Sequence, residues 1–236
     1  FLRSRRGMAM TDEGKALYHL TKGQKELEGV FLSKVSGSRR QDVAITIAGP
    51  TSAMSTRVVE QTKVLYTSFP FLRLHFQVDD SSDRIELVRR GIADLAVVSP
   101  ESVPNEMDSK LLKPDRYLLV AARAWKGRRL SEIIGTEKIA DFHQFDLTTQ
   151  RYFESFKLGE SNQPRIFANN NETLIRLMSA GIAFGTLTES VATPFLSSGD
   201  LIALNQSKAM EDPLAVAWYP RPSGPEYFEA LIASLK

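Results

Sequence analysis

The sequence predicts an α/β fold made of two similar subdomains, and a repeated stretch is the first observation behind this prediction. Residues 74–98 and residues 165–187 align with an offset of 90 positions, which places Gly91 on Gly181. Both glycines open the same short motif, Gly-Ile-Ala. Solenoid repeats recur every roughly 20–50 residues, so this longer spacing indicates two subdomains instead.

The second observation is the pattern inside each copy: an extended segment, a polar turn, a short helix, a glycine and an apolar strand. This is a parallel crossover unit, and its apolar strand suits the interior of a sheet. The glycine adopts the left-handed conformation that ends a helix. Polar turn residues cap helix N-termini; the candidates are Asp80, Ser81 or Ser82 in the first copy and Asn170 or Asn171 in the second.

The composition supports a folded domain with an apolar core. The 236 residues are 42% hydrophobic and 25% charged, and no apolar run reaches the length of a membrane span. Cysteine is absent and no secretory signal is recognisable, so we expect a cytoplasmic protein. The net charge of +2 does not by itself indicate a nucleic-acid partner. Because the chain begins at Phe1, we expect it to be part of a longer protein.

An arginine-rich start leads into a predicted helix. Arg3, Arg5 and Arg6 suit contacts to phosphate, with a solvated chain end as the alternative. Thr11 is the candidate N-cap of a helix within residues 11–36. Its seam has heptad spacing and one polar member, and it consists of Leu17, Leu20, Gln24, Leu27 and Phe31. The seam favours pairing with a second chain, and packing on its own domain is the alternative.

Hydroxyl-bearing residues follow the first predicted strand, residues 43–48. Thr51, Ser52 and Ser55 lie where a helix is expected to begin. Free N–H groups at a helix N-terminus bind carboxylates, so these residues indicate either a ligand site or simple helix capping. Ser99 opens the loop after the apolar strand of the first copy.

The rest of the chain continues the alternation of strands and helices. A strand over residues 117–122 precedes a basic stretch, residues 125–129, which we interpret as the connection between the subdomains. A strand over residues 138–142 leads into Phe142 and His143. The other predicted elements are helices over residues 57–66, 131–134, 148–156 and 227–235 and strands over residues 201–204 and 214–219.

Signatures of catalysis and of metal binding are missing from the sequence. The histidines His19, His75 and His143 lack metal-ligand spacing. No nucleophile elbow, phosphate-binding loop or dinucleotide fingerprint is present. Ligands of parallel sheets bind at the carboxyl ends of the strands, so we expect a small ligand in a cleft where two such edges face each other. No cofactor, no metal and no enzymatic activity are expected.

Two stretches resemble the LysR family of bacterial transcription regulators. The opening FLRSRRGMAMTDEGKALYHL resembles the family's wing and linker helix, with Met10-Thr11-Asp12-Glu13-Gly14 in place of its usual Leu-Thr-x-x-Gly. The segment NNNETLIRLMSAGIAFGTLTES resembles a unit of its second subdomain, although Thr186-Leu187-Thr188 replaces the usual ending in proline. The segments FQVDDSSDRIELVRRGIADLAVVS and YLLVAARAW are most similar to the branch that regulates amino-acid export and responds to lysine and arginine.

The resemblance implies two Rossmann-like subdomains of the type II periplasmic-binding-protein fold, preceded by a long linker helix. It implies a wing remnant over residues 1–10, a dimerising linker helix over 11–36, subdomain I over 43–123 and 214–236, and subdomain II over 124–213. It also implies a homodimer or homotetramer that binds promoter DNA through a helix-turn-helix domain. Only the wing of that domain is present here, so we expect poor DNA binding.

The implied effector is a small molecule such as lysine or arginine. Thr51, Ser52 and Ser99 are expected to hold its carboxylate or amide, and Asp79 or Asp80 to attract its cationic group. Phe142, His143, Asn169 and Asn170 are expected to supply further hydrogen bonds and an apolar wall. Two alternatives remain at this point: a solute-binding protein of a transporter, and an enzyme on the same scaffold, such as a deaminase or a transferase.

Overall fold

The computed structural model describes the backbone of residues 2–4 and 7–9, residues 11, 13, 14, 17, 20, 21 and 24, and residues 43–80, 83–221 and 225–236. Several predicted residues lie outside the described ones: Arg5, Arg6, Leu27, Phe31, Ser81, Ser82 and the side chain of Arg3.

The chain divides into two compact units, which are described separately. Unit 1 comprises Phe1–Lys113 and Pro213–Lys236, and unit 2 comprises Pro114–Asp212. The first crossing therefore lies ten residues before the division at 123/124 expected from the sequence, and the second lies one residue before the expected position. Both crossings occur inside strands, β6 (Asp108–Ala122) and β11 (Ala209–Trp218), and a proline follows each division.

The N-terminal strands β1 (Leu2–Ser4) and β2 (Gly7–Ala9) pair antiparallel. The residues described between 13 and 24 are helical. Gly14 donates its N–H to the hydroxyl oxygen of Thr11 at 3.2 Å, so the predicted N-cap is confirmed.

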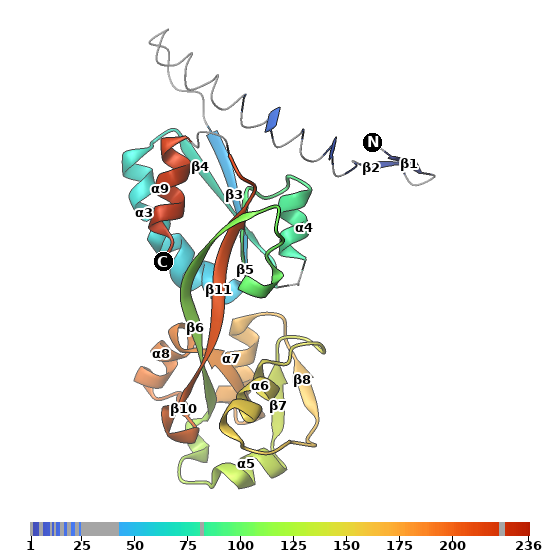
Figure 1. The fold of residues 1–236 in the computed structure, drawn as a ribbon. Coiled ribbons are helices and arrows are strands. Elements are labelled where there is room, and N and C mark those ends of the chain that lie inside the picture. The colour runs from blue at the N-terminus through green and yellow to red at the C-terminus, as the bar shows by residue number, and fades with distance from the viewer. Residues whose placement is uncertain are drawn as a thin grey trace. The chain divides into compact units, whose positions relative to one another are not determined.

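Unit 1 is a sheet in the order β4-β3-β5-β11 (Figure 1). Strand β3 (Val43–Gly49) is parallel to β4 (Leu72–Val78) and to β5 (Leu95–Val98), while β11 is antiparallel to β5. Both faces are covered, which explains why β5 is buried along its length. Helices α3 (Val59–Ser68) and α9 (Glu226–Ser234) pack on the face that carries Ile45 and Ile47, and α4 (Arg84–Arg89) packs on the other.

Unit 2 repeats this arrangement in the order β8-β7-β9-β6, with β10 (Leu201–Ala203) also paired to β6. Strand β7 (Lys138–Asp141) is parallel to β8 (Arg165–Phe167) and to β9 (Ala183–Thr188). Helices α5 (Leu130–Thr136) and α6 (Thr148–Phe156) cover the face that carries Ile139. Helices α7 (Asn171–Ser179) and α8 (Glu189–Ser198) cover the face that carries Ala140.

The coordinates confirm the sequence repeat. Gly91 and Gly181 both have a φ of 68°. The next residue in each copy closes the same helix end, because Ile92 donates its N–H to the carbonyl oxygen of Leu87 and Ile182 donates its N–H to that of Leu177. The predicted fold class of two Rossmann-like α/β units is thus confirmed, and the helix ends of the two copies share the same hydrogen bond.

Several expected elements differ from those observed. The helix expected over residues 57–66 begins earlier, as α2 (Thr51–Ala53), and passes through a π-helical segment, Met54–Val58, into α3. Strands β6 and β11 are longer than expected because they carry the chain between the units. Helix α8 was not predicted, and its internal Pro194 obscures the pattern. Short 3₁₀ turns complete the fold at Pro100–Ser102, Arg123–Trp125 and Asn205–Ser207.

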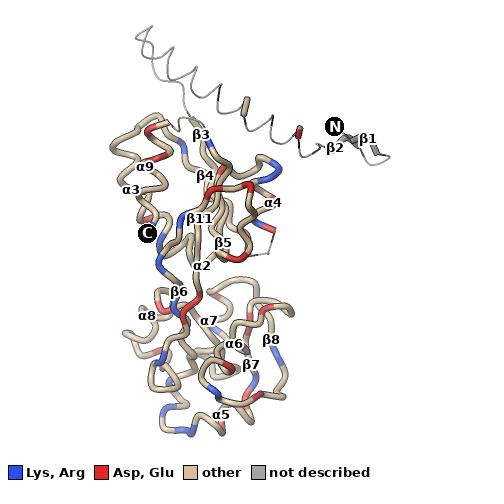
Figure 2. Tube along the Cα trace, viewed as in Figure 1, with Lys and Arg blue, Asp and Glu red and all other residues tan. Residues whose placement is uncertain are grey.

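Charged residues of both signs are interspersed through each unit (Figure 2). Across the helices that the structure describes, none is long and apolar enough to cross a membrane.

Replacing Gly181 with alanine is expected to destabilise the chain by about 1 kcal/mol, because a Cβ is strained at positive φ. A Cβ at Gly181 would also lie 3.3 Å from Nε1 of Trp125. Gly135 in α5 is the matched control, since a Cβ there meets nothing within 4 Å, and alanine favours the helix. Urea unfolding of Gly181→Ala and Gly135→Ala should give shifts of opposite sign; equal destabilisation would contradict the left-handed assignment.

Candidate functional site

One edge of the unit 1 sheet collects the polar residues predicted in this unit. Strands β3, β4 and β5 are parallel, and Gly49 at the end of β3 pairs with Val78 at the end of β4. Their carboxyl ends therefore lie at the same edge. The residues that follow these ends are Thr51 and Ser52 after β3, Asp79 and Asp80 after β4, and Ser99 after β5.

The Asp80 carboxylate binds the start of helix α2. Thr51 donates its backbone N–H to Oδ1 of Asp80 at 2.8 Å and its hydroxyl to Oδ2 at 2.5 Å. A carboxylate at a helix N-terminus is stabilised by the free N–H groups and by the helix dipole. The protein itself therefore supplies an anion to Thr51, which was predicted to receive the carboxylate of a ligand.

This contact also corrects the predicted helix cap of the first repeat. Asp80 was a candidate N-cap for α4, yet its carboxylate points to a neighbouring element, and Asp83 precedes the first residue of α4. The backbone of Asp79 fixes the same turn: its N–H donates to the carbonyl oxygen of Gly49 at 2.9 Å. Its carbonyl oxygen accepts from Nη1 of Arg84 at 2.8 Å.

Two predicted hydroxyls at this edge remain accessible. Ser52 is half-buried, and its carbonyl oxygen accepts from the Thr56 hydroxyl at 2.7 Å. Ser99 is exposed, and its carbonyl oxygen accepts from the Ser102 hydroxyl at 2.7 Å. Both residues use their backbone carbonyl oxygens to shape the turn.

An equivalent edge exists in unit 2. Strands β7 and β8 are parallel, and Asp141 pairs with Phe167 at their ends. Phe142 and His143 follow β7, while Asn169 and Asn170 follow β8. The structure thus brings the four residues predicted in this unit to one edge. Asn170 also caps α7, as predicted, because its side-chain oxygen accepts the Thr173 N–H at 2.8 Å.

The segment from residue 142 to 147, called the 142–147 loop below, is folded by its own polar groups. The Asp146 carboxylate accepts the N–H of Phe142 at 3.0 Å and that of Thr148 at 2.9 Å. Nδ1 of His143 accepts the N–H of Phe145 at 3.2 Å. Because a backbone N–H can only donate, Nδ1 is the acceptor in this contact, and Nε2 is the other ring nitrogen.

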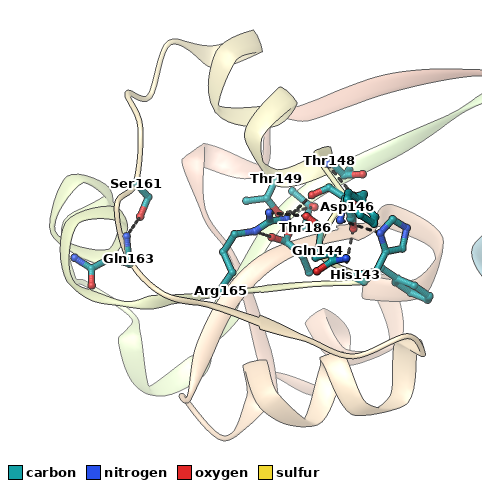
Figure 3. A network of polar contacts seen from close by, with 12 residues as sticks. His143, Gln144, Asp146, Thr148, Thr149, Ser161, Gln163, Arg165 and Thr186 are labelled. Carbon is teal, nitrogen blue, oxygen red and sulfur yellow. Dashed lines mark hydrogen bonds and ion pairs between the residues drawn. The ribbon is translucent and has the colours of Figure 1, made fainter.

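Sequence reasoning missed the polar network under this loop (Figure 3). The Asp141 carboxylate accepts the Thr149 hydroxyl at 2.7 Å and Nε of Arg165 at 2.6 Å. The hydroxyls of Thr149 and Thr186 lie 3.0 Å apart. Burial raises the pKa of Asp141 above its ordinary value, while its hydrogen bonds to Thr149 and Arg165 act in the opposite direction. The sequence does contain one signal that could have indicated this network: Asp141 is an acidic residue at the end of a buried strand.

The same network lines a cavity in unit 2. The cavity has a volume of about 270 Å³ and is lined by residues of β7, α6 and the segment before β8. Its lining includes Asp141, Thr149 and Arg165. The cavity therefore lies beside Asp141, whose side chain is only 2% exposed. Within the residues described, no group of three or more histidine or acidic side chains has metal-binding geometry.

Replacing Asp80 with alanine is expected to destabilise unit 1 by about 1 kcal/mol, because the start of α2 loses its carboxylate acceptor. Ser52→Ala is the matched control, since no described hydrogen bond uses the Ser52 hydroxyl. Thermal and urea unfolding of both variants would compare them. A stability of Asp80→Ala equal to that of the control would show that the contact contributes nothing.

Most of the chain matches a known family of protein domains. Residues 39–236 match the family described as the LysR substrate binding domain. None of the curated proteins matches the chain.

Solved structures of LysR-type regulators share the fold. Full-length LysG from Corynebacterium glutamicum, solved with its bound effector Arg, is 18% identical with a TM-score of 0.78, and the match covers 99% of this chain and 81% of LysG. ArgP from Mycobacterium tuberculosis is 21% identical with a TM-score of 0.75, covering 95% of this chain and 78% of ArgP. The C-terminal domains of a LysR family protein from Agrobacterium tumefaciens are 18% identical with a TM-score of 0.69, covering 81% and 94%. The chain therefore belongs to the LysR family and contains the effector-binding domain of a LysR-type transcription regulator.

Proposed function

We propose that the chain senses a small basic amino acid, with lysine and arginine as the first candidates. The observation that carries the proposal is the acidic turn at the edge of unit 1, where Asp79 and Asp80 follow β4. This turn is held rigidly, because Asp80 accepts two bonds from Thr51 and the backbone of Asp79 is bonded on both sides. LysG, solved with arginine as its effector, supports the same class of ligand.

The chemistry of the turn favours a cation. A carboxylate has about four acceptor positions, and the two donors of Thr51 leave room for an ammonium or guanidinium group. Such charge-assisted hydrogen bonds are roughly twice as strong as neutral ones. The Ser52 and Ser99 hydroxyls at the same edge suit the polar backbone of an amino acid.

The edge of unit 2 supplies neutral donors and an apolar surface. Nε2–H of His143 and the side-chain amides of Asn169 and Asn170 suit a carboxylate or amide. Phe142 contributes the apolar wall. We propose these four residues as the effector contacts that unit 2 supplies.

We propose that effector binding controls a homodimer or homotetramer acting on promoter DNA in the cytoplasm. The N-terminal helix supports the oligomer, because Leu17 and Leu20 of its seam are 61% and 46% exposed in the single chain. Arg3, Arg5 and Arg6 would contact DNA phosphates in the full-length protein. Membership of the LysR family does not favour a transporter component, and LysG and ArgP are regulators and not enzymes.

Calorimetric titration with L-arginine and L-lysine should release heat, whereas benzoate and L-glutamate should give none. Asp80→Asn is expected to weaken binding by about ten- to a hundredfold, because one charge-assisted hydrogen bond contributes roughly 1.5–3 kcal/mol. Asp200→Asn, which changes an exposed carboxylate in unit 2, is the control. No heat with either basic amino acid, together with binding of an organic acid, would discard the cationic effector.

Leu20→Glu is expected to lower the oligomer mass measured by light scattering after size-exclusion chromatography, because a buried charge opposes helix pairing. Lys22→Glu is the control, since heptad spacing places residue 22 away from the seam. A mass unchanged by Leu20→Glu would argue against pairing through this helix.

A further inference from the structure

One guanidinium connects the core of unit 2 to the 142–147 loop. Arg165 is the first residue of the edge strand β8. Its Nε donates to the Asp141 carboxylate at 2.6 Å. Its Nη1 donates to the carbonyl oxygen of Gln144 at 3.3 Å, and its Nη2 donates to that of Asp146 (Figure 3). Three donors of one planar group therefore bind three points on β7 and the loop that follows it.

The loop has few other restraints. Leu147 accepts the N–H of Arg151 at the start of α6. Among the described residues, the remaining hydrogen bonds of the loop are internal, reach Thr148 or come from Arg165. Phe142 packs against the core of unit 2 at the start of the loop. The rest of the loop has little apolar anchoring, because Phe145 is 77% exposed and Leu147 is 52% exposed. The conformation of the loop therefore depends strongly on Arg165.

The anchor at the other end of the guanidinium is rigid. The Asp141 side chain is 2% exposed, while that of Arg165 is 32% exposed. The carboxylate is fixed by Thr149 of α6, whose hydroxyl also contacts Thr186 of β9. A buried carboxylate with a bound cation is difficult to displace, since losing its partner leaves an uncompensated charge. Arg165 thus transmits the position of β7, α6 and β9 to the loop.

We infer that Arg165 is a positioning residue for effector binding: it sets the conformation of residues 142–147 and, through them, the placement of Phe142 and His143. This inference rests on the proposed function, which assigns effector contacts to those two residues. Arg165 itself is not assigned an effector contact. Arginine is required because its planar fork presents several donors in fixed directions, whereas lysine presents a single ammonium.

The test compares three variants of the full chain. Arg165→Lys keeps a cation for Asp141 but cannot also reach both carbonyl oxygens. Arg165→Gln removes the cation as well. Arg176→Lys is the matched control, because Arg176 forms an exposed ion pair with Glu172 on α7, with both side chains 77% exposed. The measurements are urea unfolding, amide hydrogen exchange resolved by NMR without ligand, and calorimetric titration with L-arginine and L-lysine.

Arg165→Lys should unfold close to the wild-type urea concentration, whereas Arg165→Gln should unfold earlier. In both, the Phe142 and Thr148 amides should exchange at least about tenfold faster, while the Thr173 amide, bonded to Asn170, should not change. The affinity of Arg165→Lys for the amino acid that binds the wild type should fall about tenfold. The control should match the wild type in all three measurements.

Two results would overturn the inference. Unchanged exchange at Phe142 and Thr148 in Arg165→Lys would show that the guanidinium does not hold the loop. Faster exchange with unchanged affinity would show that loop position does not affect binding. If the wild type binds neither amino acid, the effector assignment fails, while the exchange measurement still decides whether Arg165 positions the loop.

Discussion

Parallel pairing of three strands is the constraint on which the rest of each unit depends. Because β4, β3 and β5 run in the same direction, their carboxyl ends meet at one edge, and β8, β7 and β9 repeat this arrangement. Between consecutive parallel strands the chain must then pass through a turn and a helix that returns it to the opposite edge. Polar turns and helix N-termini are therefore concentrated at the edge, where a ligand finds donors and acceptors that the backbone has already oriented.

The two copies use equivalent positions differently. Asp80 and Asn170 align in the repeat, but Asp80 binds Thr51 at the start of another helix, whereas Asn170 caps the helix that follows it. Asp and Asn are about equally good N-caps, so the difference lies in the neighbouring element: Thr51 offers Asp80 both a backbone N–H and a hydroxyl. The repeated scaffold thus carries an acidic pair, Asp79 and Asp80, in one unit and an amide pair, Asn169 and Asn170, at the equivalent positions of the other.

Much of the fold could be predicted from the sequence because repeated apolar strands and helix-ending glycines are local signals. The glycines at 91 and 181, the Thr11 cap and the Asn170 cap are all of this kind. The contacts of Asp80 and Arg165 could not be predicted, because their partners lie 29 and 19–24 residues away in sequence. The extent of β6 and β11 was missed for a related reason: their polar ends, such as Asp108 to Lys113, gain their strand conformation from pairing and not from composition.

The division of the chain has a consequence for synthesis on the ribosome. Unit 2 is one uninterrupted stretch, whereas unit 1 joins the beginning of the chain to its last 24 residues, Pro213–Lys236. The core of unit 1 includes Leu214, Val216, Tyr227, Phe228 and Leu231 from that final stretch. Chains emerge from the ribosome N-terminus first. Unit 2 is therefore complete before residues 213–236 are made, and until then the N-terminal part of unit 1 exposes the apolar surface that those residues cover. Unit 1, whose N-terminal part is synthesised first, is therefore the last to complete its core.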